Sequence, residues 1–173
     1  AIYGGGIYDS VFNTEISSNS NGIDRAYAFS TLHRNPKKIL IIGLSSGSWV
    51  KVLTMNKRVE EIKVVEINKG YLDLIKNYPD HASILDMDNV KIYFDDGRRW
   101  IKRHPDEKFD FILMNTTFHW RAYSANLLSK EFLSMCKNAL KPDGVMYFNT
   151  TGFEDIFKTG AHVFNHITKY SNF

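Results

Sequence analysis

The stretch Lys38-Ile-Leu-Ile-Ile-Gly-Leu-Ser-Ser-Gly-Ser48 decides how we expect the chain to fold. Residues 39–42 form a continuous apolar run, which is typical of a β-strand covered on both faces. Residues 43–47 form a short turn of small residues, and the residues from Trp49 onward have helical spacing. A buried strand, a tight turn and a helix in direct succession predict one unit of an α/β fold.

The same pattern recurs along the rest of the chain. Further apolar runs, each typical of a strand, occupy residues 62–67, 90–94, 109–114 and 145–149. Helical patterns separate them, and Pro79 and Pro105 end two of these helices. Strands alternating with helices predict an α/β fold with a doubly wound, mainly parallel sheet and helices on both faces. Ligands bind such sheets outside the carboxyl ends of the strands, near the topological switch point.

The beginning of the chain has a different pattern. Residues 7–16 are β-prone and predict two short strands or a hairpin, and residues 17–22 predict a loop. A helix is expected over residues 23–33. The run Gly4-Gly5-Gly6 predicts a flexible entry, because it lacks the flanking strand and helix of a phosphate-binding loop.

The length of 173 residues is enough for one compact chain with a sizeable core. We divide it into a small N-terminal β element with its linking helix at residues 1–35 and an α/β domain at residues 36–173. Little chain remains after the fifth predicted strand, so we expect an excised piece of a longer protein, lacking the last strand of its sheet.

Composition excludes several classes of protein. The 22 Lys and Arg against 19 Asp and Glu give a net charge of +3, too mild to predict nucleic-acid binding. The single cysteine, Cys136, excludes an intramolecular disulfide. No apolar run approaches the length that spans a bilayer, and we expect a cytoplasmic location. His162 and His166 have metal-compatible spacing, but no third ligand is near them, so we predict no metal site.

The turn after the first buried strand is the first candidate binding element. Gly43, Ser45, Ser46 and Gly47 are small enough to let backbone amides approach a ligand. The turn lacks the glycine pattern of a dinucleotide-binding loop, which disfavours pyrophosphate. An ordinary strand-to-helix turn is the alternative interpretation.

Carboxylates follow the next two strands. Glu66 ends the second strand, 23 positions after Gly43, where a carboxylate can accept hydrogen bonds from both hydroxyls of a ribose. Asp95 and Asp96 follow the third strand, and either can accept a hydrogen bond from an adenine amino group. Each alone could be a solvated loop acid. Acids at successive strand ends, beside the turn, predict a nucleoside site.

Four segments carry a resemblance to a known family. They are Lys38-Ile-Leu-Ile-Ile-Gly43, Val64-Val-Glu66-Ile-Asn68, Phe94-Asp-Asp-Gly-Arg98 and Leu128-Ser-Lys-Glu-Phe132. These segments resemble the spermidine synthase, or polyamine aminopropyltransferase, family, which has the Rossmann-like fold of class I S-adenosylmethionine-dependent methyltransferases. Residues 8–14 resemble the strand pair that precedes the nucleotide domain of this family, with Asn13 where glutamine is usual. The resemblance covers about residues 7 to 150.

The resemblance implies a transferase that acts in polyamine biosynthesis. It would bind decarboxylated S-adenosylmethionine or methylthioadenosine, would use a nucleoside of the S-adenosylmethionine type as co-substrate, and would hold no permanent cofactor. The resemblance places Glu66 at the ribose and Asp96 at the adenine, with Ile67 and Gly97 beside them and Asn13 nearby. Residues 114–121 are similar to a branch often fused to membrane-spanning segments. A membrane-anchored parent protein and a homodimer are both compatible with it.

The sequence departs from the family where the chemistry would occur. The motif that is usually Asp-Ser-Ser-Asp reads Asn115-Thr116-Thr117-Phe118, and Ser46 replaces an acidic residue of the turn. An asparagine amide can orient an amine but cannot accept its proton near neutral pH. His119 lies in the same connection and is the candidate base. We therefore take Asn115 and His119 as the catalytic candidates, with Asn115 also at the nucleoside.

Nearby residues leave the acceptor open. Trp120 and Tyr123 can pack on a cationic group or simply cover the sheet edge, and Arg121 would suit an anionic acceptor better than a polyamine. Three functions remain: aminopropyl transfer to an amine, methyl transfer from intact S-adenosylmethionine, and nucleoside binding without catalysis.

Overall fold

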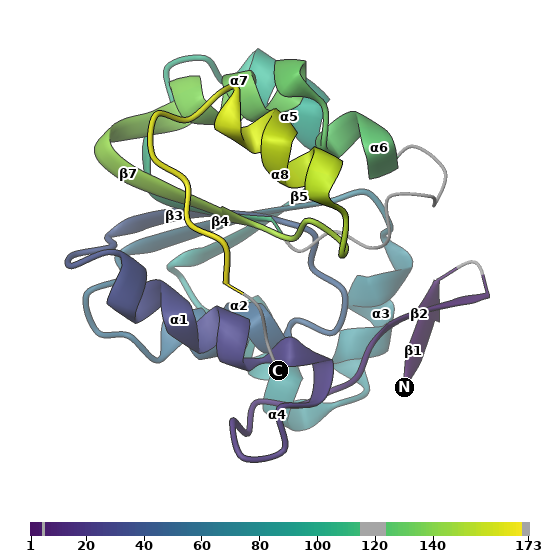
Figure 1. The fold of residues 1–173 in the computed structure, drawn as a ribbon. Helices are drawn as coiled ribbons and strands as arrows, with labels where there is room; N and C mark the ends of the chain where they lie inside the picture. The colour runs from purple at the N-terminus through teal and green to yellow at the C-terminus, as the bar shows by residue number, and fades with distance from the viewer. Residues whose placement is uncertain (5, 115–123, 171–173) are drawn as a thin grey trace.

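A computed structural model describes residues 1–4, 6–114 and 124–170. Its centre is a five-stranded sheet in the order β5-β4-β3-β6-β7, in which every neighbouring pair is parallel (Figure 1). The strands are β3 (Lys38–Ile42), β4 (Glu61–Glu66), β5 (Val90–Phe94), β6 (Phe109–Met114) and β7 (Leu140–Phe148). The predicted doubly wound α/β fold is confirmed, and its topological switch point lies between β3 and β6.

Helices cover both faces of this sheet (Figure 1). On one face lie α1 (Asp24–Leu32), α2 (Ser48–Thr54), α3 (Gly70–Lys76) and α4 (Pro79–Ala82), and on the other α5 (Gly97–Arg103), α6 (Ser124–Leu127), α7 (Lys130–Ala139) and α8 (Glu154–Ala161). Alternate residues of β3 supply the two cores: Ile41 packs with the first layer and Leu40 with the second. Both are fully buried, which is why the strand reads as a continuous apolar run.

The N-terminal hairpin lies earlier in the chain than predicted. Strands β1 (Ile2–Gly4) and β2 (Ile7–Ser10) pair antiparallel, so Gly4 and Gly6 belong to the hairpin and not to a flexible entry. Gly6 has a φ of 80°, a conformation that glycine adopts without a steric penalty, and it turns the chain back. Pairing ends at Ser10, the partner of Ile2, and the next residues bond Ser48 at the start of α2.

One helix boundary and one strand boundary also differ from the sequence prediction. Pro79 does not directly stop α3, which ends at Lys76; instead it is the first residue of α4, where its missing N–H costs no hydrogen bond. Strand β7 begins at Leu140 and not at Val145. It can include Pro142 because it is an edge strand with a register shift beside it.

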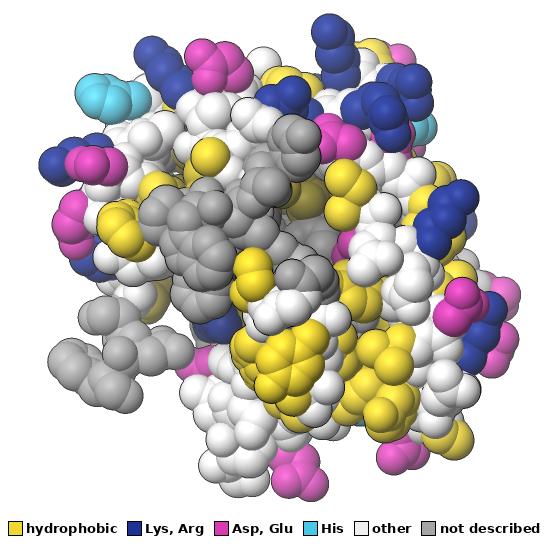
Figure 2. Space-filling view, turned by 90° about the vertical axis from the view of Figure 1, so that its right-hand side faces the viewer, with side chains coloured by type: hydrophobic (Ala, Val, Ile, Leu, Met, Phe, Trp, Pro, Cys, Tyr) yellow, Lys and Arg dark blue, Asp and Glu magenta, His cyan; other side chains and the backbone are white. Residues whose placement is uncertain are grey.

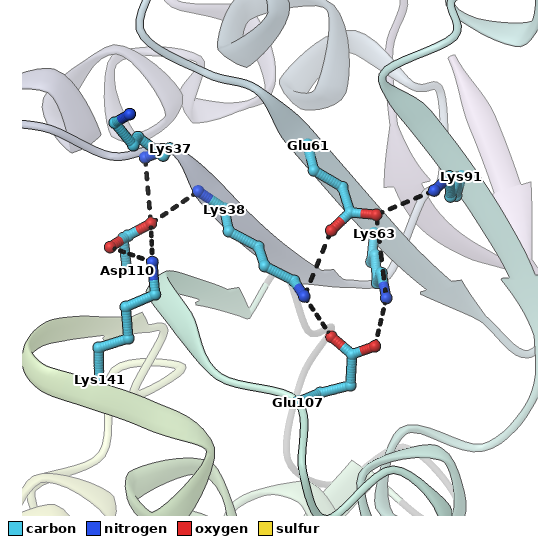
Figure 3. A network of polar contacts seen from close by, with 8 residues as sticks. All are labelled: Lys37, Lys38, Glu61, Lys63, Lys91, Glu107, Asp110 and Lys141. Carbon is cyan, nitrogen blue, oxygen red and sulfur yellow. Dashed lines mark hydrogen bonds and ion pairs between the residues drawn. The ribbon is translucent and has the colours of Figure 1, made fainter.

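The amino-terminal ends of the strands are held together by ion pairs (Figure 3). Glu107 contacts Lys38 and Lys63 at 2.5 Å each, although Lys63 lies inside the buried strand β4. Asp110 accepts hydrogen bonds from the backbone of Lys38, at 2.7 Å, and from the amino group of Lys141, at 2.8 Å. These contacts crosslink β3, β4, β6 and β7 at the edge opposite the carboxyl ends.

None of the helices that the structure describes has both the length and the apolar character needed to cross a membrane.

Candidate nucleoside site

The carboxyl ends of the strands open toward the side of the molecule on which the hairpin and α3 lie (Figure 1). Figure 2 views this side and shows hydrophobic side chains gathered over its lower part, with Lys and Arg side chains along its rim. Tyr3, Tyr8 and Tyr78 are exposed aromatic residues of the hairpin and of the segment after α3. Of the described residues predicted to bind a nucleoside, all but Asn13 lie at the carboxyl ends of β3, β4 and β5.

The turn after β3 has an unusual backbone. Gly43, Ser45 and Gly47 all have positive φ values, of 99°, 47° and 73°. A Cβ atom at Gly47 would lie 2.6 Å from the end of the fully buried Ile84 side chain, so this position requires glycine on two grounds. The backbone of the turn lies close to the end of β4, because the Leu44 nitrogen bonds Glu66.

Glu66 connects this turn to the end of β4. Its Oε2 accepts a hydrogen bond from the backbone nitrogen of Leu44 at 2.6 Å, and its Oε1 accepts one from Asn68 at 2.7 Å. The side chain is only 5% exposed. Burial raises the pKa of Glu66 above its usual value, and the backbone hydrogen bonds oppose this effect. Since a carboxylate oxygen can accept more than one hydrogen bond, Glu66 keeps acceptor capacity for a ligand hydroxyl.

Residues 10–13, which we call the strap, run from the hairpin across the turn. The hydroxyl of Ser10 lies 2.6 Å from that of Ser45, and the backbone nitrogen of Asn13 donates to Ser48 Oγ at 3.1 Å. The Asn13 amide group bonds within its own loop: its nitrogen donates to two carbonyls, and its oxygen accepts from Glu15 and Ser18. Asn13 therefore lies beside the turn, but its side chain holds the loop in this structure.

A buried hydrogen-bond chain lies beneath the strap. Ser46 donates to Ser48 at 2.8 Å, and the Ser48 hydroxyl lies 3.1 Å from Nε2 of His81 on α4. Ser46 and Ser48 are each 1% exposed. Sequence reasoning did not single out Ser10, Ser48 or His81. Ser10 and His81 reach the turn from segments more than 30 residues away, so only the fold could reveal them.

The acids after β5 have partners of their own. Asp95 pairs with Arg99 and Arg103 of α5. Burial raises the pKa of Asp95, but these two arginines and the backbone nitrogen of Asp96 outweigh that effect and hold the pKa below its usual value. Asp96 is the N-cap of α5 and accepts from the Arg99 nitrogen at 3.0 Å through one oxygen. Its second oxygen can accept from a ligand.

Apolar side chains flank these acids. Ile67 is 73% exposed directly after Glu66, and Phe94, at the end of β5, is 37% exposed. Large apolar side chains exposed at strand ends offer surfaces on which a flat base can pack. Gly97 is buried, and a Cβ atom there would lie 3.0 Å from Ile42, which keeps α5 close to the sheet.

The remaining predicted and possible sites are of three kinds. Asn115 and His119 lie outside the described residues. Among the residues that are described, the single group with metal-compatible geometry is His33, Asp110 and Asp143, and Asp110 already binds two backbone amides and Lys141. A cavity of about 820 Å³ lies along β7 and residues 164–170, but no described residue of the predicted nucleoside site lines it.

Comparison with known sequences gives a consistent result. The pattern of the spermine/spermidine synthase domain matches residues 28–171. Polyamine aminopropyltransferases from Agathobacter rectalis and Streptococcus uberis are each 36% identical over 118 residues, which are 68% of this chain and 41% of each relative. The chain thus spans about two fifths of the length of these relatives.

Solved structures share the fold. A spermidine synthase in complex with the transition-state analogue AdoDATO is 26% identical, with a TM-score of 0.73 over 83% of this chain and 51% of that one. Spermidine synthase from Thermotoga maritima is 26% identical, with a TM-score of 0.66 over 78% of this chain and 47% of that one. Human methyltransferase-like protein 13 in complex with SAH is 20% identical, with a TM-score of 0.63 over 84% of this chain and 72% of that one. At this identity the match shows the shared Rossmann-like methyltransferase fold alone.

Proposed function

Because the chain belongs to the spermine/spermidine synthase family, we propose that it binds decarboxylated S-adenosylmethionine or methylthioadenosine and transfers an aminopropyl group to an amine. The observation that carries this proposal is the position of Glu66. It is a buried carboxylate that ends β4, contacts the turn after β3 and keeps acceptor capacity. This is where a nucleoside ribose binds in open parallel sheets.

The other strand ends suit the rest of the nucleoside. We place the adenine between the exposed side chain of Ile67 and the loop that begins α5, with its amino group at the free oxygen of Asp96. The sulfur end of the nucleoside then lies over the turn, whose Gly43 and Ser45 are partly exposed. A sulfonium donor is cationic, and the carboxylate of Glu66 favours it electrostatically.

Aminopropyl transfer is a displacement at carbon. The amine nitrogen forms a bond to the methylene carbon beside the sulfonium, the carbon–sulfur bond breaks, and its electron pair stays on sulfur, so methylthioadenosine leaves. The attacking nitrogen must lose a proton to a base. We assign this role to His119 and the orientation of the amine to Asn115, since an amide cannot take the proton.

A second candidate is nucleoside binding without catalysis. It is favoured by the sequence itself, because Asn115 and Phe118 stand where the family usually has aspartates that deprotonate the amine and hold the diamine. Loss of a general base commonly lowers a rate by about 10² to 10⁴. The acceptor could also differ from the diamines of the family.

Two measurements test these alternatives. Calorimetric titration with methylthioadenosine, decarboxylated S-adenosylmethionine and the intact donor should show binding to at least one of the first two. Mass spectrometry after incubation with the decarboxylated donor and a panel of diamines should detect an aminopropylated amine together with methylthioadenosine. Binding without product would select the non-catalytic function, tighter binding of the intact donor would favour methyl transfer, and no binding of any nucleoside would refute the proposal.

A further inference from the structure

The Ser48 hydroxyl links the strap, the turn and α4. We propose that His81 is a positioning residue for the nucleoside site: in its neutral form it accepts the Ser48 proton and thereby holds the strap on the turn. This inference rests on the proposed function for its consequence at the ligand, but the coupling between His81 and the strap is a property of the protein alone.

The hydrogen-bonding capacity of Ser48 carries the argument. A serine hydroxyl has one proton to donate and two lone pairs to accept with. Ser48 Oγ accepts from the Asn13 backbone nitrogen at 3.1 Å and from the Ser46 hydroxyl at 2.8 Å, which uses both lone pairs. Its proton is then directed to His81 Nε2 at 3.1 Å, a closer acceptor than the Val11 carbonyl at 3.4 Å. Nε2 must therefore be unprotonated.

The surroundings of His81 favour that neutral form. The residue is 8% exposed and packs edge-on against the ring of Phe12 in the strap, with ring centroids 4.9 Å apart. Phe12 also stacks on Tyr78. Burial lowers the pKa of His81 below its usual value, the positive charge of Lys51 lowers it further, and Asp80 opposes both. At neutral pH the ring is thus an acceptor for Ser48.

Protonation would change the pattern. A charged His81 donates from Nε2, so Ser48 would face three donors with two lone pairs. Ser48 would have to release either the Asn13 nitrogen, whose hydrogen bond is partly buried, or the Ser46 hydroxyl, whose residue is 1% exposed. A buried polar group without a partner is unfavourable, so the strap loses its contact with the turn.

Two hydrogen bonds connect the strap to the proposed ribose position. The strap bonds Ser45 through Ser10, and the Ser45 nitrogen points to Glu66 Oε2 at 3.5 Å. Loosening the strap therefore disturbs the turn that we expect to receive the nucleoside.

The test compares the wild type with His81→Gln across pH. Glutamine keeps an acceptor oxygen within reach of Ser48 and does not titrate. In the wild type, methylthioadenosine affinity measured by calorimetry should be constant at alkaline pH and fall as pH drops below the usual histidine pKa of 6.5, by roughly tenfold once His81 is protonated, the cost of about one buried hydrogen bond. In His81→Gln the affinity at about pH 8 should be retained. Any loss of affinity that remains in acid would then come from protonation of Glu66, whose pKa is raised by burial.

His162→Gln is the matched control, because His162 is exposed at the end of α8; its pH profile should equal that of the wild type. Ser48→Ala removes the hydroxyl that joins the strap, the turn and His81, so this variant should bind methylthioadenosine more weakly at every pH. Identical pH profiles for the wild type and His81→Gln would overturn the proposal.

A second readout requires no ligand. In the wild type, the NMR chemical shift of the Asn13 amide proton should follow the titration of His81, and in His81→Gln it should not. If no nucleoside binds but the Asn13 shift follows His81, the proposed function fails and the coupling stands. If methylthioadenosine binds but the Asn13 shift is independent of His81, the coupling fails and the proposed function stands.

Discussion

Glu66 Oε2 lies 2.6 Å from the backbone nitrogen of Leu44, so the end of β4 is bonded directly to the turn that follows β3. The same carboxylate bonds the backbone of Asn68 on its other side. One buried acid thus fixes the conformation of two neighbouring strand ends and is also the residue that we propose binds the ribose. Structure and proposed function depend on the same side chain.

The turn should not tolerate a side chain at Gly47. Gly47→Ala adds a Cβ atom 2.6 Å from Ile84 at a φ of 73°, so we expect a loss of about 1–3 kcal/mol in the free energy of unfolding. Urea denaturation measures this loss. Gly152→Ala is the control, because Gly152 has a φ of 84° with open space around it and should cost less. Adding Ile84→Val, which removes the clashing methyl, should recover part of the loss; equal losses at both glycines would contradict the packing argument.

The ion pairs at the amino-terminal ends of the strands should contribute to stability. Glu107→Gln leaves Lys63, whose side chain is 10% exposed, with the longer 3.9 Å contact to Glu61 in place of the 2.5 Å contact, so we expect a loss of about 1–2 kcal/mol in the free energy of unfolding. Glu60→Gln removes a pair with Lys37 on the surface and should change stability little. The measurement is urea denaturation at neutral pH. A Glu107→Gln protein as stable as Glu60→Gln would show that this network contributes nothing.

Acid should weaken the same network. Burial raises the pKa of Glu107, but its contacts with Lys38 and Lys63 outweigh this and hold the pKa below the usual 4.5. The pKa of Asp110 is likewise lowered by Lys141 and two backbone amides against the effect of burial. A lowered pKa means that the stabilisation is fully present above the unfolded-state value and is lost as pH falls through the folded-state value. Thermal unfolding followed from about pH 6 to about pH 3 should show this loss, and Glu107→Gln should reduce it.

Restoring the carboxylate that the family usually has should increase catalysis. Asn115→Asp supplies an acceptor for the proton of the attacking amine, so the rate with a diamine such as putrescine should rise, by up to about 10² to 10⁴. Mass spectrometry of the product measures it, and Asn138→Asp on α7 serves as the control. Unchanged rates in Asn115→Asp, with methylthioadenosine affinity retained, would contradict the assignment of the lost base to this position.

The fold could be predicted from the sequence because its strands are buried on both faces. The apolar runs beginning at Ile39 and Phe109 follow from that burial alone. The ends of elements were harder to predict. Pro142 and Gly144 resemble a helix stop, yet both lie inside β7, where the free edge of the sheet tolerates them.

The candidate site could be predicted in part. The turn and Glu66 follow strands, so their position at one edge follows from the parallel sheet, and the structure brings them into contact. The strap could not be predicted, because the pairing of Ser10 with Ser45 and of His81 with Ser48 depends on the packing of segments far apart in the chain. The partners of Asp95 were missed as well, although Arg99 follows it at helical spacing.

The most direct test of the central claim is calorimetric titration of methylthioadenosine into the wild type, Glu66→Ala and the control Glu60→Ala, whose exposed carboxylate lies at the opposite edge of the sheet. All three proteins are first checked for cooperative thermal unfolding, because Glu66 also holds the turn. We predict binding by the wild type and by Glu60→Ala, and affinity at least about tenfold lower in a folded Glu66→Ala. Equal affinity in a folded Glu66→Ala, or no binding by the wild type, would contradict the account.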